Sequence, residues 1–230
     1  MFIQKIKEKY IKKAQSNSGN ERIDSQALAR INNMLEALEY GDPRCKPSKY
    51  WVELIKMNLS QLQEHGFENF KKTIALNYFT WVRITPWDSQ IIFLVKNLPL
   101  ATTIKCCYKS LHYLTEEYFS KINIIQSILY GFLTHLLWEF CKKSFRNHPD
   151  FLDLQEPTLG NPPLIKNDRV SVSQDLLNSL IETKTIIDNV DSGDIINKAL
   201  ELGAGYGRNA FVWLSKFPNI KYTLSDLPPV

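Results

Sequence analysis

The chain has 230 residues, of which 44% are hydrophobic and 23% charged, a composition that is ordinary for a soluble globular protein. The net charge of +4 has a local origin, because residues 1–13 hold five lysines and a single glutamate. The remaining residues are neutral overall, which excludes a broad basic surface of the kind that binds nucleic acid.

The first predicted element is a short basic helix near the amino terminus. Phe2, Ile3, Ile6 and Tyr10 recur at helical spacing beneath the lysines, as in an amphipathic helix. Such a helix can attach to an anionic membrane surface, but an ordinary solvated helix face is the favoured interpretation. The segment lacks the apolar core and the cleavage site of a signal peptide, and residues 16–20 follow as a linker.

Further helices are predicted along a mainly helical region that covers residues 1–150. Their ranges before residue 100 are 25–39, 48–63, 68–81 and 90–97, separated by glycine and proline signals. The range 68–81 carries the aromatic residues Phe70, Tyr78, Phe79 and Trp81. Such a row can stack on a sugar or a base, although packing inside the protein is its commoner use.

The most apolar stretch, residues 122–140, lies inside a predicted long helix or pair of helices over 111–144. Apolar residues at positions 125, 129, 132, 136 and 140 form a stripe at three- and four-residue spacing, and polar residues interrupt the stretch. This pattern predicts a core helix and no membrane span. We interpret His135, within the same helix, as a core or surface residue and not as a catalyst.

Cysteines and histidines show no pattern typical of a metal site. Cys45, Cys106, Cys107 and Cys141 contain no C-x-x-C pair, so we expect reduced thiols, as in a cytoplasmic protein. The four histidines are scattered, and no two of them are spaced to bind a metal from one helical turn.

Residues 151–172 form a predicted irregular connector that leads to an α/β segment over residues 173–230. Proline, glycine and asparagine are frequent in it, and loops of this length often carry function. A helix is predicted to begin at Ser171 or Ser173, either of which is a good N-cap, and to end near Asn189.

The α/β segment contains the most informative motif of the sequence. A strand is predicted at 198–202, a helix at 208–217 and a second strand at 221–225, and residues 201–207 read Glu-Leu-Gly-Ala-Gly-Tyr-Gly. Glycine reaches positive φ angles at little cost, so Gly203, Gly205 and Gly207 allow a sharp turn from strand to helix and a close approach of the backbone to a ligand.

Charged groups complete a candidate cofactor site around this turn. Glu201 ends the first strand, where it is placed to attract the ammonium of a ligand, and the amides at the start of the next helix favour a carboxylate. Asp226 follows the second strand, 21 residues after Gly205, near the interval at which a carboxylate receives ribose hydroxyls.

Residues 201–207 resemble the first motif of class I S-adenosylmethionine-dependent methyltransferases, and Asp226-Leu227-Pro228 resembles the acidic strand end of their O-methyltransferase branch. More narrowly, the run E-L-G-A-G-Y-G-R, the D-x-P-P at 226–229 and the segment 159–162 are similar to the sugar O-methyltransferases of bacterial surface-glycan clusters. The resemblance implies S-adenosylmethionine as cofactor and a sugar hydroxyl of a glycan as acceptor. The cofactor-binding residues that it implies are Glu201, Gly203, Ala204, Gly205, Gly207 and Asp226.

A nicotinamide dinucleotide is the closest alternative ligand. Its fingerprint is G-x-G-x-x-G/A. Counted from Gly203, the final position holds Arg208, whereas the glycine falls one position earlier, at Gly207. The spacing therefore favours the methyl donor.

The expected fold is a mainly α N-terminal region followed by the start of a Rossmann-like domain with its first two parallel strands only. The sequence ends 23 residues after Gly207, and methyltransferase domains carry several more strands, so we expect weak or undetectable cofactor binding and assign no catalytic residue. Two functions stay open: the N-terminal part of a sugar O-methyltransferase, and a non-enzymatic remnant or helical interaction module with a vestigial cofactor loop. A homodimer through the helical region is a further expectation.

Overall fold

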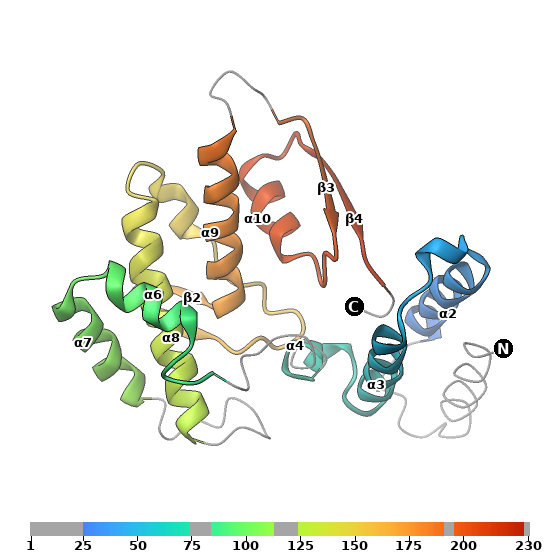
Figure 1. Cartoon of the computed structure of the whole chain (residues 1–230), viewed down its shortest axis with the longest axis horizontal. Coiled ribbons are helices and arrows are strands. Elements are labelled where there is room, and N and C mark those ends of the chain that lie inside the picture. Colours follow the sequence, from blue (N-terminus) through green and yellow to red (C-terminus); the bar gives the residue numbers. More distant parts are fainter. Residues whose placement is uncertain (1–24, 74–83, 113–123, 191–195, 228–230) are drawn as a thin grey trace. The chain divides into compact units, whose positions relative to one another are not determined.

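The computed structural model describes residues 25–73, 84–112, 124–190 and 196–227, which fall into two compact units. The first unit comprises Met1–Phe79, Leu159–Asn161 and Asp226–Val230, and the second comprises Thr80–Thr158 and Pro162–Ser225. Helices account for most of the described residues, and the strands form two sheets of two strands each (Figure 1). The domain boundaries expected near residues 150 and 172 stay predictions.

The first unit consists of helices that share a small apolar core. Its elements are α2 (Ser25–Tyr40), η1 (Pro43–Cys45), α3 (Lys49–His65), η2 (Phe67–Asn69) and α4 (Phe70–Thr73). The core cluster joins α2 and α3 and consists of Ile31, Leu35, Ile55, Leu59 and Leu62. The helices predicted at 25–39 and 48–63 are confirmed, because their apolar spacing supplies this core.

Some predicted elements lie wholly or partly outside the described residues. The helix expected over 68–81 is helical from Phe70 to Thr73, and residues 74–83 are not described. The basic helix and linker expected over residues 1–20 are also outside the described ranges.

The second unit is built around α8 (Ile124–Ser144). This helix packs against α6 (Ser89–Asn97), α7 (Leu100–Ser110) and α9 (Gln174–Asn189), and η5 (Pro149–Asp153) follows it. The helix predicted at 90–97 is confirmed, and so is the helix predicted to begin at Ser171 or Ser173 and to end near Asn189. Ser173 is the N-cap of α9, because its hydroxyl oxygen accepts the N–H of Leu176 at 3.1 Å.

The face that α8 buries differs from the predicted stripe. In that stripe position 136 is buried, positions 129, 132 and 140 are half-buried and position 125 is exposed, whereas Tyr130, Leu133, Leu137 and Cys141 outside it are buried. The helix is apolar on several sides, so spacing alone does not select the side that meets its neighbours. By length and composition alone, α8 is long and apolar enough to cross a membrane. However, 56% of its most apolar stretch is buried inside the protein, as in a core helix.

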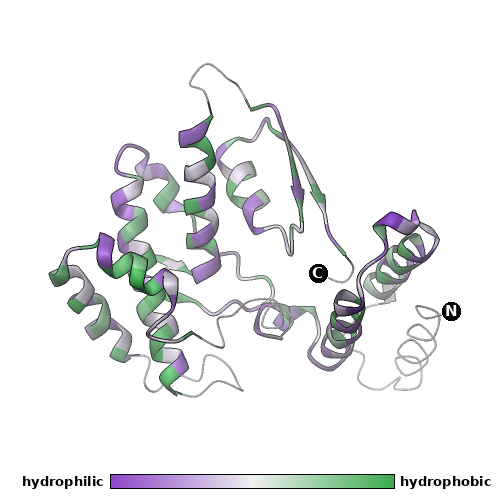
Figure 2. Ribbon diagram, viewed as in Figure 1, coloured by the Kyte–Doolittle hydropathy of each residue, from purple (hydrophilic) through white to green (hydrophobic). Residues whose placement is uncertain are grey.

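Helix α7 was not predicted. Of the one or two helices predicted over 111–144, the part from Ile124 to Ser144 is confirmed as α8, and residues 113–123 are outside the described ranges. The structure has α7 at Leu100–Ser110, with Leu111 at its C-cap. The reason lies in its patterning, because the large apolar residues of α7 are exposed while Cys106 and Ser110 are buried. Hydrophobic positions are visible along both α6 and α7 in Figure 2.

All four cysteines are free, as predicted. Cys106 and Cys141 are buried, and burial raises the pKa of the Cys106 thiol to about 11. Cys45 and Cys107 are exposed. The buried pair are therefore protonated, unreactive core residues at neutral pH.

The segment expected to be irregular contains a β-hairpin. β1 (Ile165–Asn167) pairs antiparallel with β2 (Val170–Val172), and Ile165 lies opposite Val172 with both side chains buried. Asp168 adopts a φ of +49° in the turn between them. The sequence signal of this hairpin is the alternation of apolar and polar residues on both sides of Asn167-Asp168. This alternation is too short to stand out from a loop rich in turn residues.

A strand–helix–strand element forms the end of the second unit. β3 (Lys198–Leu202) and β4 (Lys221–Ser225) pair in parallel, with Leu202 opposite Ser225, and α10 (Arg208–Lys216) connects them (Figure 1). α10 packs on α9 and thereby attaches the strands to the helices. The predicted order of strand, turn, helix and parallel strand is confirmed.

Candidate functional site

The glycine loop, residues 203–207, joins β3 to α10 and has three glycines in the left-handed region. The φ angles are +73° at Gly203, +55° at Gly205 and +79° at Gly207. Because most residues with a side chain adopt this region only with strain, the backbone favours glycine at these alternate positions. The sequence-based argument for a sharp turn is therefore confirmed.

The strand edge holds the loop in place, and one side of the loop is open. The N–H of Gly203 donates to the carbonyl of Ser225 at 2.8 Å, and the N–H of Gly207 donates to the carbonyl of Ala204 at 3.0 Å. Ala204 is buried. A Cβ added to Gly203 would meet no atom within 4 Å. Space for a ligand therefore exists beside Gly203, whereas Ala204 turns into the protein.

Glu201 is half-buried and its carboxylate is held by two neighbours. Oε1 accepts from the Asn209 side-chain amide at 3.1 Å, and Oε2 accepts from the Tyr222 hydroxyl at 3.1 Å. The same amide group of Asn209 donates to Glu182 at 2.8 Å. Burial and the Glu201 charge raise the pKa of Tyr222, which therefore stays a hydroxyl donor.

Asp226 directly follows β4 but belongs to the first compact unit. Its Oδ1 accepts the N–H of Leu227 at 2.6 Å. A joint ligand site formed by Asp226 and the glycine loop stays a prediction.

Sequence reasoning missed the buried ionic network beneath the loop. The network consists of Arg208, Glu156, Ser173, Tyr206 and Asp175. Arg208 begins α10, is buried, and donates from Nη1 to Glu156 Oε2 at 2.7 Å and to Ser173 Oγ at 2.8 Å. Ser173 Oγ in turn donates to Glu156 Oε2 at 2.6 Å. One guanidinium thus connects the residues before β1, the start of α9 and the start of α10.

Tyr206 completes the network from inside the glycine loop. Its hydroxyl donates to Asp175 Oδ2 and accepts from Arg208 Nη2 at 2.5 Å, and the guanidinium carbon lies 4.7 Å from the centre of its ring. Burial and the Asp175 charge raise the pKa of Tyr206. The side chains of Tyr206 and Arg208 are therefore directed into the protein, where they fix the loop, and the glycine backbone is the part left for a ligand.

The start of α10 adds a further feature to the loop. Gly207 is its N-cap and offers no side chain to the first-turn amides. Those amides have no partner within the helix and carry the positive end of its dipole. Together with the carboxylate of Glu201, the loop presents groups that suit a zwitterionic ligand, one that carries both an ammonium and a carboxylate.

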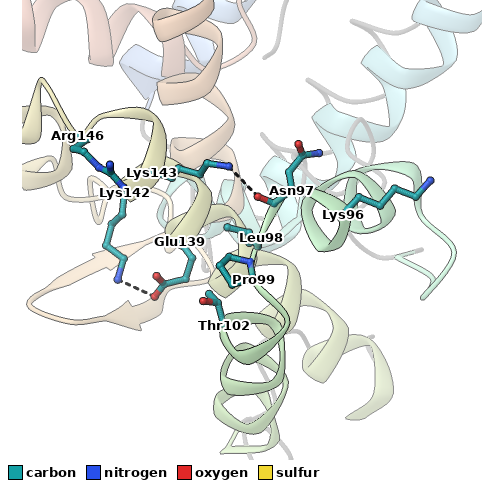
Figure 3. A pocket seen from close by; sticks show the side chains of 9 residues that line it. All are labelled: Lys96, Asn97, Leu98, Pro99, Thr102, Glu139, Lys142, Lys143 and Arg146. Carbon is teal, nitrogen blue, oxygen red and sulfur yellow. Dashed lines mark hydrogen bonds and ion pairs between the residues drawn. The ribbon is translucent and has the colours of Figure 1, made fainter.

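A second location with binding chemistry is a basic pocket at the junction of α6 and α7. Its volume is about 500 Å3, and Lys96, Lys142, Lys143 and Arg146 line it together with the single carboxylate of Glu139. Figure 3 shows Lys142 paired with Glu139, while Lys143 is directed to Asn97 and Lys96 points away from the others. The Lys142–Glu139 distance is 2.8 Å.

No cluster of three or more metal-binding side chains occurs within residues 25–73, 84–112, 124–190 and 196–227. His135 is buried, and its Nδ1 lies 2.6 Å from Asn167 Oδ1. Burial lowers the pKa of His135, so the ring is neutral at pH 7. This is the environment of a core histidine.

Comparisons with known proteins give no match, whether to a family model, to a curated protein or to a solved structure.

Proposed function

We propose that β3, the glycine loop and α10 bind S-adenosylmethionine, and that the chain supplies this unit to an O-methyltransferase that acts on a sugar hydroxyl of a glycan. The observation that carries the proposal is the loop itself. Three glycines at alternate positions have positive φ angles, and the side of Gly203 is open. The sugar acceptor rests only on the likeness of residues 201–208 and 226–229 to sugar O-methyltransferases.

Each group of the loop has a role in this proposal. The amides at the start of α10 receive the carboxylate of the methionine part. Glu201 uses two of about four acceptor positions on its carboxylate for Asn209 and Tyr222, and the remaining positions are available to the ligand ammonium. The Arg208 network holds the loop in this arrangement before the ligand arrives, which lowers the entropy cost of binding.

The bound cofactor would supply an electrophilic methyl group for in-line attack by the acceptor oxygen. Positioning provides much of the rate in such a transfer. A general base for the acceptor hydroxyl is not assigned among the described residues.

The test measures binding of S-adenosylmethionine to the purified chain by ligand-observed NMR at high ligand concentration, which detects weak as well as tight binding. Glu201→Gln removes the charge while keeping the shape and should reduce the signal. Glu182→Gln is the matched control, since it removes a carboxylate from the same Asn209 amide and lies outside the loop.

Two results would contradict the proposal. The first is no signal from S-adenosylmethionine together with a clear signal from a nicotinamide dinucleotide. The second is an equal signal from the wild-type chain and from Glu201→Gln. Low-micromolar binding, in contrast, would support the proposal and overturn only the expectation of weak affinity.

A helical interaction module is the second candidate function. The exposed apolar side of α7 favours it.

A further inference from the structure

The outer face of α7 is apolar and exposed. Leu100, Ile104, Tyr108 and Leu111 recur at four-, four- and three-residue spacing and therefore share one side of the helix. They are 74%, 60%, 68% and 46% exposed. We call this set the α7 outer face. Contiguous apolar surface of this kind is typical of an interaction site, whereas single exposed apolar residues are normal.

The opposite side of the same helix attaches it to the protein through small residues. Cys106 and Ser110 are buried there, and Thr103 is half-buried, on the side that packs against α8. A helix that only covers the core normally places its large apolar residues inward. In α7 the arrangement is reversed, so its outer face is not explained by packing within the described part of the second unit.

The charges around this face are mainly positive. From Ser89 to Ser110 the sequence contains Lys96, Lys105 and Lys109 and no aspartate or glutamate. Lys105 is exposed and Lys109 half-buried beside the outer face. The basic pocket at the start of α7 adds Lys142, Lys143 and Arg146, of which Lys142 is paired with Glu139 at 2.8 Å and with Asp168 at 3.4 Å. The partner that complements this region is therefore anionic.

The charge and the shape of the α7 outer face together indicate which kind of partner binds it. A second copy of the chain would bring the lysines of one α7 against those of another, which is unfavourable. A single convex helix also offers no groove for a partner peptide. Aliphatic residues, a tyrosine and flanking lysines on one helix face are instead the pattern that lies in a membrane interface, where lysine stems extend to the phosphates.

We propose that the α7 outer face lies on an anionic lipid bilayer, with Leu100, Ile104 and Tyr108 at the acyl boundary and Lys105 and Lys109 at the lipid phosphates. This attachment is peripheral and involves no membrane span. It does not depend on the function proposed for the glycine loop, because α7 and the loop use different residues.

The test is co-sedimentation of the full chain with vesicles of phosphatidylcholine, alone or mixed with about one third phosphatidylglycerol. We expect binding to the mixed vesicles, and we expect that binding to fall as salt screens the lysines. Lys105→Gln with Lys109→Gln should lower the partition coefficient about thirtyfold. Leu100→Ser with Ile104→Ser should lower it more than about tenfold, because two apolar side chains no longer enter the interface.

Matched controls separate α7 from the rest of the chain. Ile186→Ser changes an exposed isoleucine on α9, and Lys198→Gln with Lys221→Gln changes two exposed lysines on the strands. Neither control should alter vesicle binding. Circular dichroism should show equal helix content in every variant.

Three outcomes would overturn the proposal. One is no binding to the mixed vesicles. Another is binding that the α7 variants leave unchanged, which would place the contact elsewhere, for instance at the five lysines of residues 1–13. The third is a dimer in sedimentation equilibrium that Leu100→Ser with Ile104→Ser dissociates, which would assign the face to a second copy.

Discussion

The glycine loop and the α7 outer face depart from the usual arrangement of a globular protein in opposite ways. Beneath the loop the buried groups are charged, because Arg208, Glu156 and Asp175 lie together out of water. On α7 the exposed groups are apolar, with Ile104 and Tyr108 in solvent. The first region contains polar groups that only a specific set of partners can satisfy, and the second contains surface that the fold leaves uncovered.

This difference predicts different consequences of mutation. A buried charge that loses its partner destabilises the fold. An exposed apolar side chain contributes little to folding, so its removal affects only what it binds. Stability measurements on the two regions therefore separate a structural role from an interaction role.

The largest effect is expected for Arg208→Met, which removes the guanidinium from two buried carboxylates. The free energy of unfolding should fall by about 3–5 kcal/mol, measured by urea denaturation followed through tryptophan fluorescence. Lys216→Met, at the other end of α10, removes an ion pair with the exposed Asp150 at 3.2 Å, a hydrogen bond to the Asp150 carbonyl and a contact over the Phe151 ring, and should cost less than Arg208→Met, about 1–2 kcal/mol. If both variants lost the same free energy of unfolding, burial would not explain the contribution of the Arg208 network to stability.

A smaller effect is expected for Gly203→Ala in the loop. The added Cβ meets no atom, so the cost of about 1–2 kcal/mol comes from the φ of +73° alone. Gly203→Asn should cost less than alanine, since asparagine adopts the left-handed region more readily. If asparagine proves the more damaging in thermal unfolding, contact and not backbone strain controls this position.

Because His135 is buried in the helical core, we expect the stability of the protein to depend on pH. Burial lowers its pKa below the ordinary value of 6.5, so the unfolded state binds the proton more readily than the folded state. The free energy of unfolding is therefore not reduced by His135 above pH 6.5. It falls as the pH drops below that value, because the unfolded state takes up the proton first. The melting temperature measured between pH 7.5 and 5 should fall less steeply in His135→Gln than in the wild-type chain, and an unchanged slope would exclude His135 as its source.

The smallest effect on stability is expected for Leu100→Ser with Ile104→Ser. Both side chains are mostly exposed, so the free energy of unfolding should change by less than about 0.5 kcal/mol per site. Vesicle binding by the same variant should nevertheless fall more than about tenfold. A large destabilisation in urea would show that the face is packed within the protein and would remove the basis for a lipid contact.

Several elements were predictable because their signals are local. The glycine spacing predicted the turn from β3 to α10. The N-cap of α9 was predicted at Ser171 or Ser173, and the structure has it at Ser173. The hairpin at 165–172 and helix α7 were missed. The strands of the hairpin are three residues long, and the apolar residues of α7 do not mark an inward face.

The residues of the candidate site also divide into those that the sequence predicted and those whose role only the structure showed. Glu201 and the three glycines were identified from their place at a strand end, whereas the structural roles of Tyr206 and Arg208 were not. The partner of Arg208 is Glu156, 52 residues earlier in the chain, and no spacing rule connects two such positions.

The sequence by itself determined the order of strand, glycine turn, helix and strand, because backbone preferences depend on residues only a few positions apart. Only the tertiary structure decided which side of α8 is buried, that α7 turns its large apolar residues outward, and that one arginine anchors the glycine loop. These features depend on the packing of segments far apart in the chain, and the free energy of packing overrides local preference wherever the two compete.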